Sequence, residues 1–215
     1  MHRFLTKIFV LSLTLGLFGF SSAGCLNAER NALDASTIEG LLAQFFASQK
    51  KAAFKGVIFI VTNTDAQFGG VSGADTKCSN NIPSGLSGSF KAFIVNYTSP
   101  TRRATITANA GDGQLDWVLQ PNTEYIREDG STLIGKTNAQ SLLEFPLQNS
   151  IGTAGLNWTG LNTDWTAIIS DCANWSVGAF DNCQAGDLTA TGTTALSSSA
   201  PYFNTSQNLA CVSQP

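Results

Sequence analysis

Three of the four tryptophans of this 215-residue chain, Trp158, Trp165 and Trp175, fall within 18 consecutive positions. A tryptophan buries a large flat surface and needs a partner for its single N–H, so this cluster predicts a hydrophobic core. Cys172 and Cys183 are separated by ten residues and can close a small loop over it. We expect Trp158 and Trp175 in the core, and Trp165 either in the core or in contact with a ligand.

Residues 1–24 have the composition of a signal peptide. Two basic residues open the segment, and the apolar stretch 8–20 is short for a membrane span but typical of a signal-peptide core. Small residues then precede Cys25, as at a bacterial lipoprotein cleavage site, although Ser22 stands where leucine is usual. We predict that Cys25 becomes the lipidated N-terminus. Ordinary signal-peptidase cleavage nearby is the alternative.

The cysteine count supports this prediction. The chain has five cysteines, and lipidation of Cys25 leaves four, an even number in an exported chain. Four cysteines allow three pairings into two disulfides. A four-cysteine metal site is disfavoured because the sequence has no Cys-x2-Cys pair.

Charge and histidine content exclude several functions. The net charge of −3 becomes −5 when Arg3 and Lys7 leave with the signal peptide, which disfavours nucleic-acid binding. The only histidine, His2, leaves as well, so His-based catalysis and His-based zinc sites are not available. We predict a protein that is not an enzyme and needs no cofactor or metal. We expect solvated carboxylates at Asp112, Asp116, Glu124, Glu128 and Asp129.

The remaining pattern divides the chain into a tether with a helix (25–55) and one domain (56–215). Apolar spacing predicts a helix over 34–53, packed on the domain or acting as a stalk, with a membrane-surface or partner helix as the alternative. Gly56–Thr62 predicts a buried strand, and Ser72 is expected to cap a short helix that carries Asp75 and Cys78. Further predicted elements are strands at 90–97, 115–119 and 208–213, a hairpin of 125–127 with 132–134 around Asp129-Gly130, and loops at 80–89 and 184–199.

The tryptophan-rich stretch also carries a resemblance. Trp158-Thr159-Gly160-Leu161 is similar to the Trp-Ile-Gly-Leu signature of C-type-lectin-like folds. The chain more closely resembles the leptospiral endostatin-like family of bacterial surface lipoproteins, over residues 56–212. The motifs that carry this resemblance are Gly69–Cys78, Phe90–Phe93, Asp116–Asn122, Asp129-Gly130, Trp158–Leu161, and Cys172 with Trp175.

The resemblance implies an α+β fold with an endostatin-like, C-type-lectin-like domain, strand-rich with long loops and preceded by the N-terminal helix. In that architecture the first cysteine pairs with the last and the two middle ones pair together. This implies the disulfides Cys78–Cys211 and Cys172–Cys183. Structural roles in the core are implied for Trp158, Gly160, Leu161 and Trp175.

The implied function is that of a lipid-anchored outer-membrane protein on the cell surface. It would bind host proteins such as laminin, fibronectin, complement factor H or plasminogen. A periplasm-facing structural lipoprotein and a glycan-binding module are the alternatives. Gln120-Pro121-Asn122 resembles a calcium-lectin triplet but precedes Trp158, and no Trp-Asn-Asp follows, so we predict a turn there. No motif marks a ligand site; Arg102, Arg103, Trp165 and the loop 184–199 are the candidate contacts.

Overall fold

The computed structural model describes residues 39–40, 54–176 and 181–215. The predicted signal peptide, Cys25 and all but two residues of the helix expected at 34–53 lie outside these ranges. Among the described residues, no helix combines the length and the apolar character needed to cross a membrane. Nearly all of the described residues belong to the domain that begins near residue 54.

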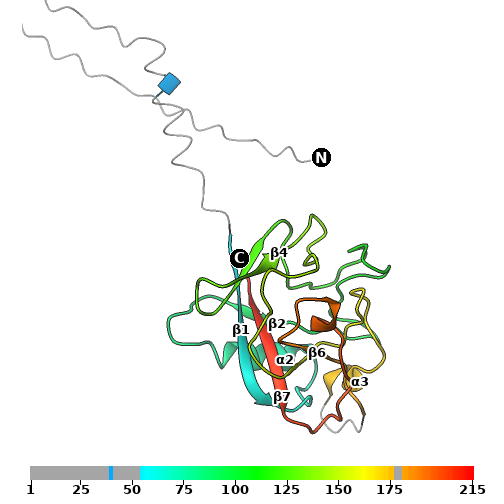
Figure 1. Ribbon diagram of the computed structural model, residues 1–215. Coiled ribbons are helices and arrows are strands. Elements are labelled where there is room, and N and C mark those ends of the chain that lie inside the picture. Colours follow the sequence, from blue (N-terminus) through cyan, green and yellow to red (C-terminus); the bar gives the residue numbers. More distant parts are fainter. Residues whose placement is uncertain (1–38, 41–53, 177–180) are drawn as a thin grey trace, which may run out of the picture. The chain divides into compact units, whose positions relative to one another are not determined.

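One strand-rich sheet organises this domain (Figure 1). Its order is β4-β3-β1-β7-β5-β6, and β2 pairs with β7 beside β5. The central strands β1 and β7 are antiparallel, whereas β1 runs parallel to β3 and β5 runs parallel to β7. The strands are β1 (Gly56–Thr64), β2 (Phe90–Ala92), β3 (Glu124–Arg127), β4 (Leu133–Lys136), β5 (Leu156–Trp158), β6 (Ala185–Asp187) and β7 (Gln207–Ser213).

Alternation along the central strands divides the core between the two faces of the sheet. Successive side chains of a strand point to opposite faces. Accordingly Ile58 packs with Ala210 and Val212 in one cluster, and Phe59 packs with Leu209 and Cys211 in the other. The second cluster holds Trp158, Trp175 and all four disulfide cysteines; we call it the stapled cluster. The first holds Trp165, and we call it the open cluster.

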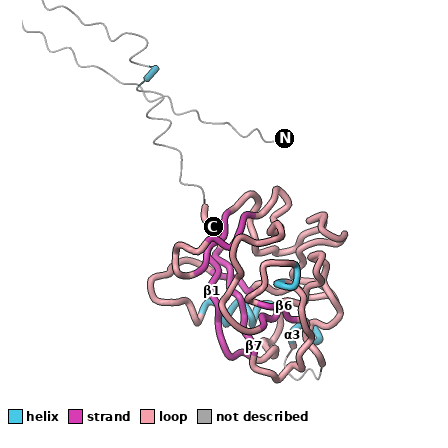
Figure 2. The backbone as a smooth tube through the Cα atoms, viewed as in Figure 1, coloured by secondary structure: helices cyan, strands magenta, loops and turns pink. Residues whose placement is uncertain are grey.

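Helices are few and short. They are α2 (Val71–Ser79), α3 (Cys172–Trp175) and the 3-10 turn η1 (Thr193–Ala195). Figure 2 shows that loops make up most of the domain and surround the sheet. The prediction of a strand-rich domain with long loops and two disulfides is thus confirmed.

Several predicted elements are present. The buried strand at 56–62 is β1, the last strand through Cys211 is β7, and the hairpin around Asp129-Gly130 is β3 with β4. Pro121 and Asn122 form a turn, as expected. These segments are the ones whose sequence pattern is strongest.

Other predictions were wrong. Ser72 lies inside α2, which begins at Val71 after an N-cap glycine that makes no side-chain cap. The strand expected at 90–97 ends at Ala92, because the Val95 N–H bonds instead to the carbonyl of Thr159 at 2.9 Å. Residues 115–119 form only an isolated bridge at Leu115, since Asp116 has a positive φ of 40° that breaks an extended chain.

The segment 184–199, predicted as a loop, contains β6 and η1. Its small residues permit a close approach of two backbones. A Cβ on Gly186 would lie 1.9 Å from the carbonyl oxygen of Ala195, so only glycine fits there. The glycine and alanine residues that favoured a loop prediction are needed in this segment because the two backbones pack closely.

Candidate functional site

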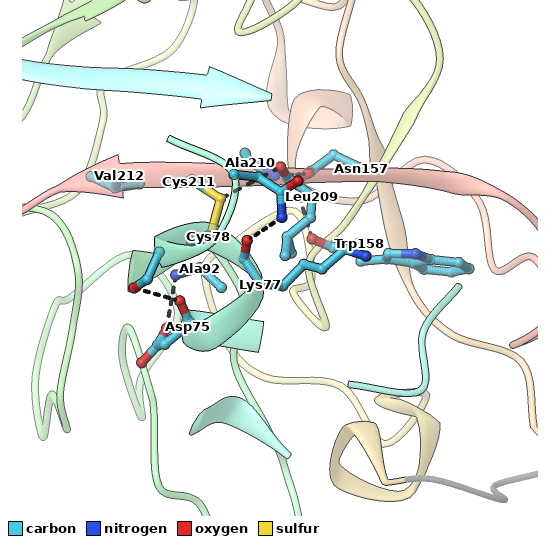
Figure 3. The surroundings of a disulfide bond; sticks show 12 residues. Asp75, Lys77, Cys78, Ala92, Asn157, Trp158, Leu209, Ala210, Cys211 and Val212 are labelled. Atoms are coloured by element: carbon cyan, nitrogen blue, oxygen red, sulfur yellow. Dashed lines mark hydrogen bonds between the residues drawn. A yellow bond between two sulfur atoms is a disulfide. The ribbon is translucent and has the colours of Figure 1, made fainter. Parts of the chain in front are cut away.

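Two disulfides fix the frame that carries the loops. Cys78 of α2 is bonded to Cys211 of β7, and Cys172 is bonded to Cys183, with Cα–Cα distances of 5.6 and 5.0 Å. These are the pairs that the resemblance implies. In Figure 3 the Cys78–Cys211 bond holds α2 against β7, and the Asp75 carboxylate accepts the N–H of Ala92 at 2.8 Å. The helix is therefore tied to the sheet both covalently and by a hydrogen bond.

The signature residues lie in the core. Trp158 and Trp175 are fully buried, and their indole N–H groups donate to the carbonyls of Thr64 (3.1 Å) and Val95 (2.8 Å). A Cβ on Gly160 would lie 2.5 Å from the Val95 carbonyl oxygen, and its φ of 67° suits glycine. The fully buried Leu161 follows. This segment therefore anchors the chain at Val95, two residues before an exposed loop.

Arg102, predicted as a candidate ligand contact, is buried in the structure, which argues against that role. Its side chain is 0% exposed, and all five N–H donors of the guanidinium are used. Nη1 donates to Asp75 Oδ1 and the Ala92 carbonyl, Nη2 to Asp75 Oδ2 and Asp116 Oδ2, and Nε to the Asp116 carbonyl, at 2.5–3.0 Å. Burial opposes the charge of Arg102, but these carboxylates outweigh it and raise its pKa. The residue joins α2 to the loop that carries Asp116.

Arg103, the next residue, lies at the surface beside large apolar side chains. Together with Pro100, Thr166 and others it lines a hollow of about 250 Å³. Tyr97 and Ile106 line the same hollow and are 52% and 59% exposed. Ile169, at 69% exposure, lies two residues before Asp171, whose carboxylate accepts the Tyr97 N–H at 2.7 Å. We call Tyr97, Arg103, Ile106 and Ile169 the Tyr97 patch.

Buried polar side chains hold the first loop of this patch. The Oδ1 atom of Asn96 accepts the N–H groups of Thr101 and Arg102 at 2.9 and 3.0 Å. Its Nδ2 atom lies 3.1 Å from Asn174 Oδ1, across from the short disulfide loop. These hydrogen bonds to the buried side-chain amide of Asn96 thus hold residues 97–101 in a closed loop.

A carboxylate holds the second loop. Asp112 accepts hydrogen bonds from the backbone and hydroxyl of Thr107, the hydroxyl of Thr105 and the backbone of Ile106, at 2.7–3.0 Å. These bonds, led by the Thr107 N–H, lower the pKa of Asp112 well below its usual range. The charge therefore persists at any physiological pH and keeps Ile106 in place.

Trp165 is 2% exposed and belongs mostly to the core, but one part of it reaches the surface. It lines a second hollow of about 360 Å³, together with Asn109, Glu144 and Phe145 among others. A backbone hydrogen bond of 2.9 Å, from Asn109 to the Asp164 carbonyl, joins the walls of this groove. The sequence left Trp165 between core and ligand contact, and the structure places it at the boundary.

A third hollow, of about 460 Å³, lies along β1 between Ile58, Ile60 and the segment 151–155. Its cation, Arg127, donates to the carbonyls of Ser150 and Gly152 and closes one end. Among the described residues no group of three His, Cys, Asp or Glu side chains is placed to hold a metal ion.

No sequence motif identified Tyr97, Ile106, Asn109 or Glu144 as candidate site residues. Tyr97 was expected at the end of a strand, and the exposure of Tyr97 and Ile106 depends on how the loops that carry them pack. A protein family described as "Protein of unknown function (DUF1554)" matches residues 61–194. No curated protein matches the chain.

Proposed function

The chain belongs to the DUF1554 family, and because the function of that family is unknown, we propose a function from the residues of this member. We propose that it is a non-catalytic binding protein that contacts host proteins through the Tyr97 patch. The observation that carries the proposal is the exposure of Tyr97 and Ile106 around a hollow that Arg103 also lines. The exposed Ile169 lies two residues before Asp171, which accepts the Tyr97 N–H.

The residue types of the patch favour a protein partner. Tyrosine and arginine are enriched among the residues that dominate binding energies at interfaces. Arg103 donates through Nε to the Gly113 carbonyl at 2.8 Å and has no carboxylate partner among the described residues. Its charge is therefore available to a carboxylate of the partner, while Tyr97 and Ile106 supply apolar area.

The loops are also organised in advance. Asn96 and Asp171 fix the backbone beside Tyr97, and Asp112 fixes the backbone beside Ile106. Loops that are already ordered lose less conformational entropy on binding, which raises affinity for a given contact area. A frame with two disulfides and exposed rigid loops suits recognition rather than catalysis.

The remaining parts of the proposal come from the resemblance and the N-terminal sequence. The domain would be an endostatin-like, C-type-lectin-like member of the leptospiral lipoprotein family. Lipidated Cys25 would hold it in the outer membrane at the cell surface, since two or more acyl chains give stable anchoring. Laminin, fibronectin, factor H and plasminogen are the host proteins that the resemblance implies.

The test is binding of the lipid-free chain, residues 26–215, to each of these immobilised proteins. We expect saturable binding to at least one, and a loss of tenfold or more in the double variant Tyr97→Ala/Ile106→Ala, because truncating a hot-spot side chain costs about 2 kcal/mol or more. Tyr202→Ala is the matched control, since Tyr202 is 43% exposed but lies outside the patch.

Two outcomes would contradict the proposal. Equal loss in the Tyr97 and Tyr202 variants would show that the patch is not the contact surface. Absence of binding by folded protein to all four ligands would remove the host-binding function. Protease treatment of intact cells would then test the periplasm-facing alternative, in which the protein survives until the outer membrane is opened.

A further inference from the structure

The four tryptophans differ in the use of their indole N–H. Those of Trp117, Trp158 and Trp175 donate to backbone carbonyls at 2.8–3.1 Å. The N–H of Trp165 makes no hydrogen bond within the described part of the chain. No buried side-chain nitrogen or oxygen in that part lacks a partner, so this N–H must be reached by solvent. Trp165 is thus 98% covered, but its one polar atom remains available to a group outside the protein.

Trp165 also lines the hollow of about 360 Å³ already described, which we call the Trp165 groove. The ring itself is fixed by three aromatic neighbours. Trp117 and Phe93 meet it edge to face at centroid distances of 6.0 and 6.2 Å, and Phe145 lies 5.8 Å away. The donor therefore has a defined direction and costs little to order on binding.

Other polar groups around the groove are also uncommitted. The side chains of Asn109, Glu144 and Thr193 make no hydrogen bond or ion pair with any described residue. Asn138 uses its Oδ1 atom to accept from Gln140 and Leu142, which leaves its Nδ2 donors free. Donors and acceptors therefore surround a floor to which Leu142 and Phe145 contribute apolar surface.

We propose that the Trp165 groove binds a neutral saccharide unit without a metal ion. A sugar hydroxyl can accept from the Trp165 N–H while donating to Glu144, and ring C–H groups can rest on Phe145 and Leu142. Among the described residues that line the groove, Glu144 is the only ionisable one, so anionic ligands such as phosphates and sulfated glycans are disfavoured.

The main competitor is an extended peptide, whose carbonyl could also accept from Trp165. An extended peptide binds through main-chain hydrogen bonds along a sheet edge and gains specificity from pockets for alternate side chains. The uncommitted groups here line one hollow of about 360 Å³ instead, and they include both donors and acceptors. A ligand with several hydroxyls on one small ring can use more of them together.

This site is distinct from the Tyr97 patch. Thr166 lines the hollow of the patch, and the preceding Trp165 lines the groove. A backbone bridge pairs Thr105 with Thr166, and both residues line the hollow of the patch and not the groove. The inference goes beyond host-protein binding, and each proposal can fail while the other stands.

The experiment uses the indole resonances of ¹⁵N-labelled protein, residues 26–215, in the presence of EDTA. Glucose, galactose, mannose and N-acetylglucosamine, and short neutral oligomers of each, are titrated in turn. We expect one sugar to shift the Trp165 indole resonance saturably while those of Trp117, Trp158 and Trp175 stay in place. Trp165→Phe identifies the resonance, and the three others report that this variant is folded.

Two further variants test the contacts. Asn109→Ala and Glu144→Gln change exposed side chains and should each weaken the sugar about tenfold, the effect of one good hydrogen bond. Glu128→Gln, an exposed glutamate outside the groove, should leave affinity unchanged.

Several results would overturn the inference. A Trp165 resonance that responds to none of these sugars removes the saccharide site. A resonance that responds only to an added host protein assigns the groove to a protein interface instead. Equal shifts of all four indoles, or equal effects of the Glu144 and Glu128 variants, would show non-specific contact.

Discussion

The stapled and open clusters on the two faces of the sheet use tryptophan in different ways. In the stapled cluster Trp158 and Trp175 lie 6.4 Å apart, fully buried, with both N–H groups bonded to backbone. In the open cluster Trp165 is packed almost as completely but its N–H is left for solvent. The stapled cluster therefore holds the fold together, whereas the open cluster has a polar group through which recognition is possible.

The stapled cluster also supports the recognition surface. The Val95 carbonyl that accepts the Trp175 N–H lies two residues before Tyr97. Asp171, directly before Cys172, accepts the Tyr97 N–H. The disulfides and buried tryptophans therefore fix the base of a loop whose tip is exposed, so damage to this cluster should reach the Tyr97 patch.

Loss of the long disulfide should have the largest effect. Cys78 and Cys211 are 133 residues apart, so the chain-entropy model assigns this bond about 5 kcal/mol, compared with about 3 kcal/mol for Cys172–Cys183. The pair Cys78→Ala/Cys211→Ala should therefore lower the free energy of unfolding more than Cys172→Ala/Cys183→Ala. Urea unfolding monitored by tryptophan fluorescence measures both. A greater loss from the short loop would contradict this ordering.

The parts of the fold that the sequence predicted are those with local or covalent signals. β1 is a continuous β-branched and aromatic run, the β3–β4 hairpin has its Asp129-Gly130 turn, and the burial of Trp158 and Trp175 follows from their size. Each depends on the residue types themselves and on few distant contacts.

The parts that were missed depend on distant contacts. Arg102 and Arg103 are adjacent in sequence, yet one is fully buried and the other lies at the surface. The difference arises because Asp75, 27 residues earlier, and Asp116, 14 residues later, converge on Arg102. A lone arginine carries no sign of such partners. For the same reason the unpaired N–H of Trp165 could not be predicted from its sequence neighbours.

Trimming one tryptophan in each cluster should give the next largest effect. Trp175→Phe removes buried volume and leaves the Val95 carbonyl without its donor, so it should cost about 3 kcal/mol of unfolding free energy. Trp165→Phe removes similar volume but breaks no internal hydrogen bond, and should cost about 1 kcal/mol less. Urea midpoints at constant slope measure the difference.

Trp117→Phe is the matched control for that difference. Trp117 packs against Trp165 at a centroid distance of 6.0 Å, yet its N–H donates to the Ser141 carbonyl at 2.9 Å. If the indole hydrogen bond determines the difference, Trp117→Phe should lower the unfolding free energy by more than its half-buried position alone predicts. If Trp165→Phe and Trp175→Phe lower the unfolding free energy equally, the missing internal hydrogen bond of the Trp165 N–H does not distinguish the two tryptophans.

The smallest expected effect concerns the ionic link between the two faces, and it depends on pH. Arg102 joins Asp75, on the helix of the stapled cluster, to Asp116, directly before Trp117. Burial opposes the charge of Asp116, but the hydrogen bonds and charges of Lys91 and Arg102 outweigh it and lower its pKa. Its ionised form thus stabilises the folded state fully above pH 3.8, the value for an unperturbed aspartate.

As the pH falls below that value, the unfolded state takes up a proton before the folded state, so this contribution is lost. Because the Asp116 side chain is 41% exposed, solvent screening limits the effect to about 1 kcal/mol or less. Urea midpoints at pH 6 and pH 3 should therefore fall less for Asp116→Asn than for the unmodified chain. Asp187→Asn, at a carboxylate that bonds only within its own turn, is the control. An unchanged pH response in Asp116→Asn would mean that the ionised Asp116 does not contribute to holding the two faces together.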